Sequence, residues 1–85
     1  MDNIEQISEK EYIVAGSASI VKVLEELEMN DDLEEDIDVF TVSGWVMDIM
    51  GKVPEEGDSF EYHDMLGSVL EMDGKRVGKI RIILK

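Results

Sequence analysis

The spacing of the apolar residues changes near Pro54, and this change constrains the fold more than any other feature of the sequence. Before Pro54, apolar residues recur every three or four positions in two sets: Ile20, Val23, Leu24 and Leu27, then Val42, Trp45, Val46, Ile49 and Met50. Each set falls on one face of an α-helix. After Pro54 the period becomes two, as in Ile80, Ile82 and Leu84. Strands with one buried face have this spacing, so the chain is predicted to be an α+β domain.

Capping residues mark the ends of the two predicted helices. Ser17 or Ser19 can begin the first, because a serine hydroxyl accepts a hydrogen bond from a free amide at a helix start. Thr41 is a suitable N-cap for the second helix. Gly51 suits the left-handed position at its C-terminus, and Pro54 prevents the helix from continuing.

The residues after the second helix are predicted to form three strands. The first carries Phe60 and Tyr62 on one face, the second runs from Met65 to Met72, and the third runs from about Arg76 to Leu84. Glycine within the second strand, at Gly67, marks a bulge or a close contact.

Two turns separate these strands. His63-Asp64 is predicted to form the first. Asp73-Gly74 is a signal for a two-residue hairpin turn of type I′, in which both central positions need positive φ. We therefore expect the last three strands to pair as an antiparallel meander.

A β-prone run, Tyr12-Ile13-Val14, precedes the first helix and is stopped by Gly16. The predicted order is thus strand, helix, helix, then a three-stranded antiparallel meander, with the helices packed on one face of the sheet. Residues 1–10 are predicted to be a linker or tail, and residues 11–85 to form the domain.

The charge balance is strongly acidic, with 21 acidic against 8 basic side chains and a formal net charge of −13. Such a surface repels phosphate backbones and anionic lipid headgroups, so nucleic acid is not expected as a partner. No stretch approaches the roughly 20 apolar residues that span a bilayer, so direct membrane insertion is not expected either. The chain has no cysteine, which excludes disulfides and thiolate metal sites.

The acidity is concentrated in residues 28–38, and six carboxylates lie close together there: Asp31, Asp32, Glu34, Glu35, Asp36 and Asp38. Carboxylate oxygens suit Mg²⁺ or Ca²⁺, and these six residues are the candidate metal ligands. Their spacing does not fit an EF-hand, because the sixth position from Asn30 is Glu35 and not glycine. The two interpretations are a solvated run of charge and a site of weak Mg²⁺ or Ca²⁺ binding.

Residues for catalysis are lacking, so the chain is predicted not to be an enzyme. A nucleophile needs a base within reach and a group that orients it. His63 is the only histidine, and a zinc site usually needs three or four protein ligands. The serines, of which Ser17 and Ser19 serve best as caps and turn residues, have no partner motif. There is no Gly-x-Gly-x-x-Gly or P-loop sequence for a nucleotide.

Four segments resemble one known family in order and spacing. They are Tyr12-Ile13-Val14-Ala15-Gly16-Ser17, Thr41-Val42-Ser43-Gly44-Trp45-Val46, the run from Gly51 through Pro54 and Gly57-Asp58 to Tyr62, and the hairpin from Val69 to Val77. The chain is similar over roughly residues 11–85 to the CorC/HlyC transporter-associated domain.

The resemblance implies a context for the chain. Domains of this family usually lie at the cytoplasmic C-terminus of hemolysin-like proteins that carry paired CBS domains and often a membrane domain. Those proteins are linked to magnesium and cobalt efflux, and the domain is thought to modulate ion transport. The fold is grouped with a subdomain of FAD-binding enzymes, so FAD enters by fold analogy only. No cofactor is predicted from the residues themselves.

Two hypotheses about function follow. In the first, the chain is a non-catalytic accessory domain that docks onto the CBS domains and the membrane domain of its parent protein. In the second, it senses a ligand by binding a divalent cation, a flavin or a nucleotide directly. If the final strand lies at a sheet edge, its free amides could also pair with a second copy and form a homodimer.

Overall fold

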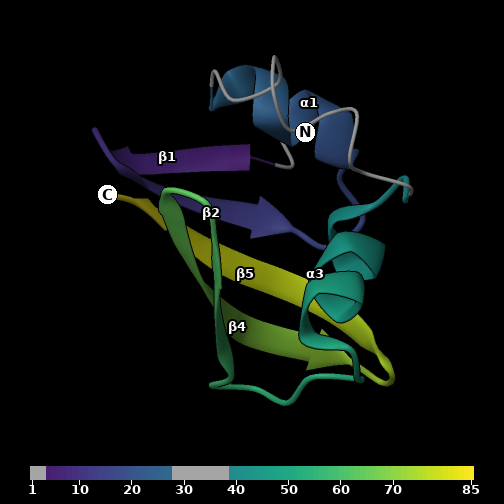
Figure 1. Ribbon diagram of the computed structural model, residues 1–85. Coiled ribbons are helices and arrows are strands. Elements are labelled where there is room, and N and C mark those ends of the chain that lie inside the picture. The colour runs from purple at the N-terminus through teal and green to yellow at the C-terminus, as the bar shows by residue number, and fades with distance from the viewer. Residues whose placement is uncertain (1–3, 28–38) are drawn as a thin grey trace.

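The computed structural model describes residues 4–27 and 39–85, which form an antiparallel sheet and two helices (Figure 1). The strand order across the sheet is β1-β2-β5-β4-β3. The strands are β1 Ile4–Ser8, β2 Glu11–Ala15, β3 Ser59–Tyr62, β4 Met65–Asp73 and β5 Arg76–Leu84. The predicted α+β class is confirmed, because helices and strands share one core.

Both helices begin at a capping residue that the sequence indicates, and the second also ends at the predicted one. Helix α1 spans Ile20–Glu26, and the Ser19 hydroxyl accepts a hydrogen bond from the amide of Lys22. Helix α3 spans Val42–Met50, with Thr41 as N-cap and Gly51 at φ 70° after its last turn. Neither described helix is long and apolar enough to cross a membrane.

The core lies on one face of the sheet. Alternate strand residues are fully buried there, including Val14 on β2, Met65 and Val69 on β4, and Ile80 and Ile82 on β5. The apolar faces of α1 and α3 belong to the same buried cluster. Both helices therefore cover this face, as predicted, and the opposite face of the sheet has no described helix against it.

The N-terminal residues correct one prediction. Within residues 1–10, expected to be a linker or tail, residues 4–8 form strand β1 and pair with β2, with Ile4 opposite Val14. β1 has one neighbouring strand only, and its residues after Ile4 are exposed. The sheet therefore has two strands before the helices, and the predicted arrangement of one strand before them is incomplete.

The last strand is central and not at an edge. β5 pairs with β2 on one side and with β4 on the other, so that Ile80 lies between Val14 and Val69. Its backbone amides are used within the sheet. A homodimer through β5 is therefore not supported, since the edges of the described sheet are β1 and β3.

The β4–β5 hairpin turns one residue later than predicted. Asp73 pairs with Arg76, so the central turn residues are Gly74 and Lys75. Among the described residues, positive φ occurs at Gly74 but not at Lys75, which contradicts the expected type I′ turn. The register of Val69 with Ile80 is the same as that of Met72 with Val77, on either side of an irregularity at Glu71, and this register places the turn at Gly74 and Lys75.

Gly67 is a point of close contact, one of its two predicted roles. A Cβ atom at this position would lie 2.1 Å from Cζ of Phe60, so the phenyl ring occupies the space that a side chain would need. His63 forms the predicted turn between β3 and β4 and has φ 52°.

Candidate functional site

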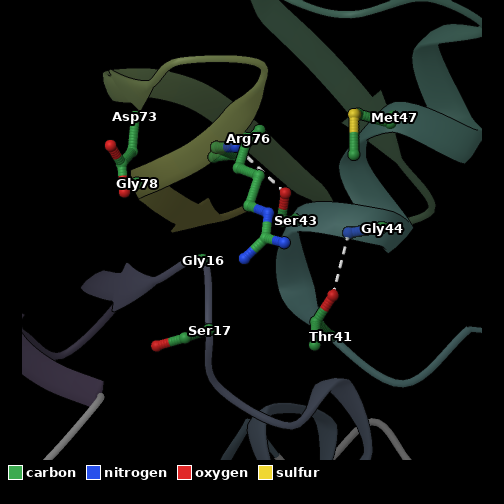
Figure 2. A pocket seen from close by; sticks show the side chains of 10 residues that line it. Gly16, Ser17, Thr41, Ser43, Gly44, Met47, Asp73, Arg76 and Gly78 are labelled. Carbon is green, nitrogen blue, oxygen red and sulfur yellow. Dashed lines mark hydrogen bonds between the residues drawn. The ribbon is translucent and has the colours of Figure 1, made fainter.

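Three segments that are far apart in the sequence surround a cavity of about 520 Å³. They are the turn after β2, the start of α3 and the β4–β5 hairpin (Figure 2). The lining residues are Gly16, Ser17, Thr41, Ser43, Gly44, Met47, Asp73, Arg76, Val77 and Gly78. The volume falls in the range of about 300–1,000 Å³ that is typical of small-molecule sites.

Gly16 joins the three segments. Its amide donates to the carbonyl oxygen of Gly78 at 2.9 Å, and its own carbonyl accepts from the amide of Ser43, also at 2.9 Å. The chains approach so closely that a Cβ at position 16 would lie 1.7 Å from the carbonyl oxygen of Val77. Only glycine fits here, because this contact is with backbone that belongs to a central strand.

Ser43 links the helix to the hairpin. Its Oγ accepts a hydrogen bond from the amide of Val77 at 2.9 Å, and the two residues are 7% and 3% exposed. A buried amide without an acceptor is costly, so this hydroxyl has a structural role in a chain where serines were expected mainly as caps and turn residues.

Replacing Ser43 should measurably weaken the fold. We expect Ser43→Ala to lower the free energy of unfolding by about 1–3 kcal/mol, because the buried Val77 amide loses its acceptor. Urea denaturation followed by circular dichroism measures the change. Ser17→Ala is the matched control, since Ser17 is exposed and makes no hydrogen bond with a described residue. It should change stability by less than about 0.5 kcal/mol. Equal losses in both variants would contradict this role.

The first amides of α3 are already bonded within the protein. Val42 N–H donates to the carbonyl of Ala18 at 2.9 Å, Ser43 N–H donates to Gly16, and Gly44 N–H donates to Thr41 Oγ1 at 3.1 Å. The helix start therefore offers the cavity no free amide in its first three positions. These three amides are therefore not available to recognise a charged ligand.

The charged side chains of the cavity are Arg76 and Asp73, both at exposed positions of the hairpin. Arg76 forms no ion pair with a residue in the described ranges. Figure 2 shows its guanidinium group extending toward the space between Gly16 and Gly44, while the Asp73 carboxylate lies apart from it on the same hairpin. The arginine is thus not neutralised by the acid of its own hairpin.

The residues predicted to bind metal lie in a part of the chain that the structure does not describe. Asp31, Asp32, Glu34, Glu35, Asp36 and Asp38 all lie outside the described residues. Residues 4–27 and 39–85 contain no group of three or more histidine, cysteine, aspartate or glutamate side chains placed to hold a metal ion. The prediction of weak Mg²⁺ or Ca²⁺ binding at these six carboxylates stays a prediction.

The cavity also lacks the parts of a nucleophilic site. The described lining contains hydroxyls from Ser17, Ser43 and Thr41 but no histidine, lysine or cysteine to act as a base. His63 lies in the β3–β4 turn, where its ring packs edge-on against Tyr62 at 4.6 Å between centroids.

A second surface is the sheet face opposite α1 and α3, termed here the open face. Leu66 on β4 and Ile83 on β5 are paired neighbours on it and are 43% and 38% exposed. Ile13 on β2 lies on the same face, next to the Glu11–Arg81 ion pair. The Arg81 Nε and Glu11 Oε2 atoms are 3.2 Å apart without hydrogen-bond geometry. The open face therefore combines an apolar centre with charges of both signs.

The family comparison decides the identity of the fold. The sequence model of the CorC_HlyC transporter-associated domain matches residues 5–85. The chain belongs to this family. The match includes most of β1, which agrees with β1 being a strand of the transporter-associated domain and not a tail. No curated protein sequence matches the domain significantly.

Solved structures agree with this membership. A hemolysin domain from Enterococcus faecalis is 28% identical, with 98% of each chain covered and a TM-score of 0.82. The transporter-associated domain of a CBS domain protein from Porphyromonas gingivalis is 25% identical, with 98% of each chain covered and a TM-score of 0.81. A Xylella fastidiosa hemolysin domain in complex with Mg²⁺ and Mn²⁺ is 17% identical, with 99% of each chain covered and a TM-score of 0.80.

Sequence reasoning found several lining residues without finding the cavity. Gly16 was identified as a strand stop and Thr41 as a cap, whereas Arg76 was only the start of a strand. The three segments converge because β2 pairs with β5, which brings together residues more than 60 positions apart in the sequence. A glycine directly after a β-prone run was the one local signal of the close approach.

Proposed function

We propose that this chain is a non-catalytic accessory domain of a CBS-containing membrane protein that is linked to magnesium and cobalt transport. In this proposal it lies on the cytoplasmic side of the membrane and modulates transport by docking onto the CBS domains of its own parent protein. Membership of the transporter-associated domain family carries the proposal. The relative from Porphyromonas gingivalis, which comes from a CBS domain protein, supports the partner.

The open face is the surface that we assign to docking. Its centre is aliphatic, at Leu66 and Ile83, and burial of such side chains is the main favourable term in association. Charged pairs flank this centre: Arg81 with Glu11, and Lys85 with Glu61 at 2.8 Å. Polar groups around an apolar centre are typical of protein interfaces. Because this face carries charges of both signs, it would repel an acidic partner less than the rest of a surface with a net charge of −13 would.

Polar substitutions on the open face should uncouple the domain from the transporter. We expect Leu66→Gln with Ile83→Thr, made in the full-length parent protein, to weaken docking about tenfold or more. Divalent-cation efflux from loaded vesicles should then resemble that of a protein lacking the domain. Val53→Thr is the matched control, because Val53 is 50% exposed but lies in the segment after α3. Wild-type efflux in the double variant, with its fold intact by circular dichroism, would contradict docking by this face.

A second candidate function is direct sensing of a divalent cation. The observation that favours it is the Xylella fastidiosa relative, which was solved in complex with Mg²⁺ and Mn²⁺. In this chain the cation would be held by carboxylates of residues 31–38, the densest run of acids in the sequence. Sensing would use residues 31–38 and docking would use the open face, so mapping the binding surface by NMR distinguishes the two functions.

A further inference from the structure

The cavity between the β2 turn, the α3 start and the β4–β5 hairpin presents hydrogen-bond donors that no described residue uses. The guanidinium of Arg76 carries five N–H donors in a fixed fork. The Ser43 hydroxyl accepts from Val77, and its own O–H has no acceptor among the described residues. Ser17 also lines the cavity, but Figure 2 shows its hydroxyl directed away from Arg76. Donors from the hairpin and from the start of α3 thus lie next to one space (Figure 2).

The chemistry of these donors selects the ligand. An arginine fork matches the two oxygens of a carboxylate or a phosphate, and hydroxyl groups can donate to the same oxygens. The amides of Val42, Ser43 and Gly44 are bonded within the protein, so the helix start is not what recognises the ligand. A cavity of about 520 Å³ has room for an organic body next to the charged group.

We propose that this cavity binds a small organic anion whose carboxylate or phosphate group pairs with Arg76 and accepts a hydrogen bond from Ser43. Met47 supplies an apolar wall for the body of the ligand. The inference goes beyond the docking function, because the cavity and the open face share no residue. It holds or fails independently of whether the domain docks onto CBS domains.

Asp73 limits how much negative charge the cavity accepts. It lies on the same hairpin as Arg76, and the two are paired across the turn without an ion pair between their side chains. A carboxylate near the site repels an anion through space. Removing its charge with Asp73→Asn should therefore tighten binding of an anion, whereas it would weaken binding of a cation.

The test is an NMR titration of the isotope-labelled domain with ribose 5-phosphate and, separately, with succinate. Sodium chloride of equal ionic strength corrects for salt effects. We expect saturable shifts of the lining amides, at Ser17, Ser43, Gly44, Val77 and Gly78, with at least one probe. A response to ribose 5-phosphate assigns phosphate as the recognised group, and a response to succinate assigns carboxylate. Absence of saturable shifts with both probes overturns the proposal.

Two charge variants distinguish specific binding in the cavity from general electrostatic attraction to the hairpin. Arg76→Gln should raise the dissociation constant about tenfold or more, because a charge-assisted hydrogen-bond pair is lost. Lys75→Gln removes the same charge from the same hairpin at an exposed turn position that does not line the cavity. It should change the constant less than about twofold, since exposed charges interact weakly through water. Equal weakening in both variants, or weaker binding in Asp73→Asn, would overturn the assignment.

Discussion

Gly16→Ala is expected to lower the free energy of unfolding by about 3 kcal/mol or more. The added methyl group would lie 1.7 Å from the Val77 carbonyl oxygen and 2.7 Å from its carbonyl carbon. Both atoms belong to the backbone of β5, which is held between β2 and β4, so no rotamer change can relieve the clash. Either the start of β5 shifts, or the hydrogen bond from Gly16 to Gly78 breaks.

Thermal unfolding followed by circular dichroism measures this effect. In a domain of this size 1 kcal/mol corresponds to about 4–8 °C, so the midpoint should fall by about 12 °C or more. Gly44→Ala is the matched control, because its Cβ would meet Thr41 Oγ1 at 3.4 Å, an ordinary contact. Gly44 lies within α3, where alanine is favoured over glycine by about 0.5–1 kcal/mol. Equal midpoints for the two variants would contradict the close contact between Gly16 and the Val77 backbone.

Trp45→Ala is expected to cost about 3–5 kcal/mol. The indole is 2% exposed and packs edge-on against two rings of β3, Phe60 at 5.7 Å and Tyr62 at 5.2 Å between centroids. Alanine would leave a large cavity between α3 and the sheet and would remove both aromatic contacts. Because the reporter tryptophan is lost, denaturation has to be followed by circular dichroism.

Trp45→Phe separates ring packing from the polar atom of the indole. Trp45 Nε1 is buried without an acceptor among the described residues, so its removal carries no hydrogen-bond cost. Phenylalanine keeps one ring against Phe60 and Tyr62. We therefore expect it to cost less than half as much as alanine. A phenylalanine variant as unstable as Trp45→Ala would mean that the N–H group makes an essential bond.

The helices could be predicted because their signals are local. Thr41, Gly51 and the apolar spacing between them lie within one stretch of chain, and the structure confirms each of them. Alternation in β5 likewise identified its buried face, at Ile80 and Ile82. These features can be recognised from residues that are close in the sequence, because helices and strands differ in the spacing of their apolar residues.

The strand β1 and the position of β5 could not be predicted in this way. β1 lies at the edge of the sheet, and only Ile4 of its five residues is even partly buried. An edge strand with so little burial does not need alternating apolar and polar residues, and its sequence has no such pattern. The central place of β5 depends on pairing with β2, in which Glu11 lies opposite Ile83. Such pairing leaves no local pattern. The turn was predicted one residue too early, because Asp73-Gly74 is a local signal whereas the register between β4 and β5 decides which residues turn.

The candidate site was missed for the same reason. Its segments meet because β2 pairs with β5 and because Gly16 is hydrogen-bonded to both Gly78 and Ser43. From the local sequence, Gly16 was predicted only to end a strand. Arg76 lies next to a turn, where a charged residue is ordinary.

Mapping the surface that the labelled domain uses is the most direct test of the proposed function. The measurement is an NMR titration of the domain with the CBS pair of its parent protein, and separately with Mg²⁺. The docking account predicts that the CBS pair shifts amides of the open face, around Ile13, Leu66 and Ile83, and that Mg²⁺ leaves these amides unchanged. A domain that shows no shift with the CBS pair, but localised shifts at residues 31–38 with millimolar Mg²⁺, would contradict docking and establish a cation sensor.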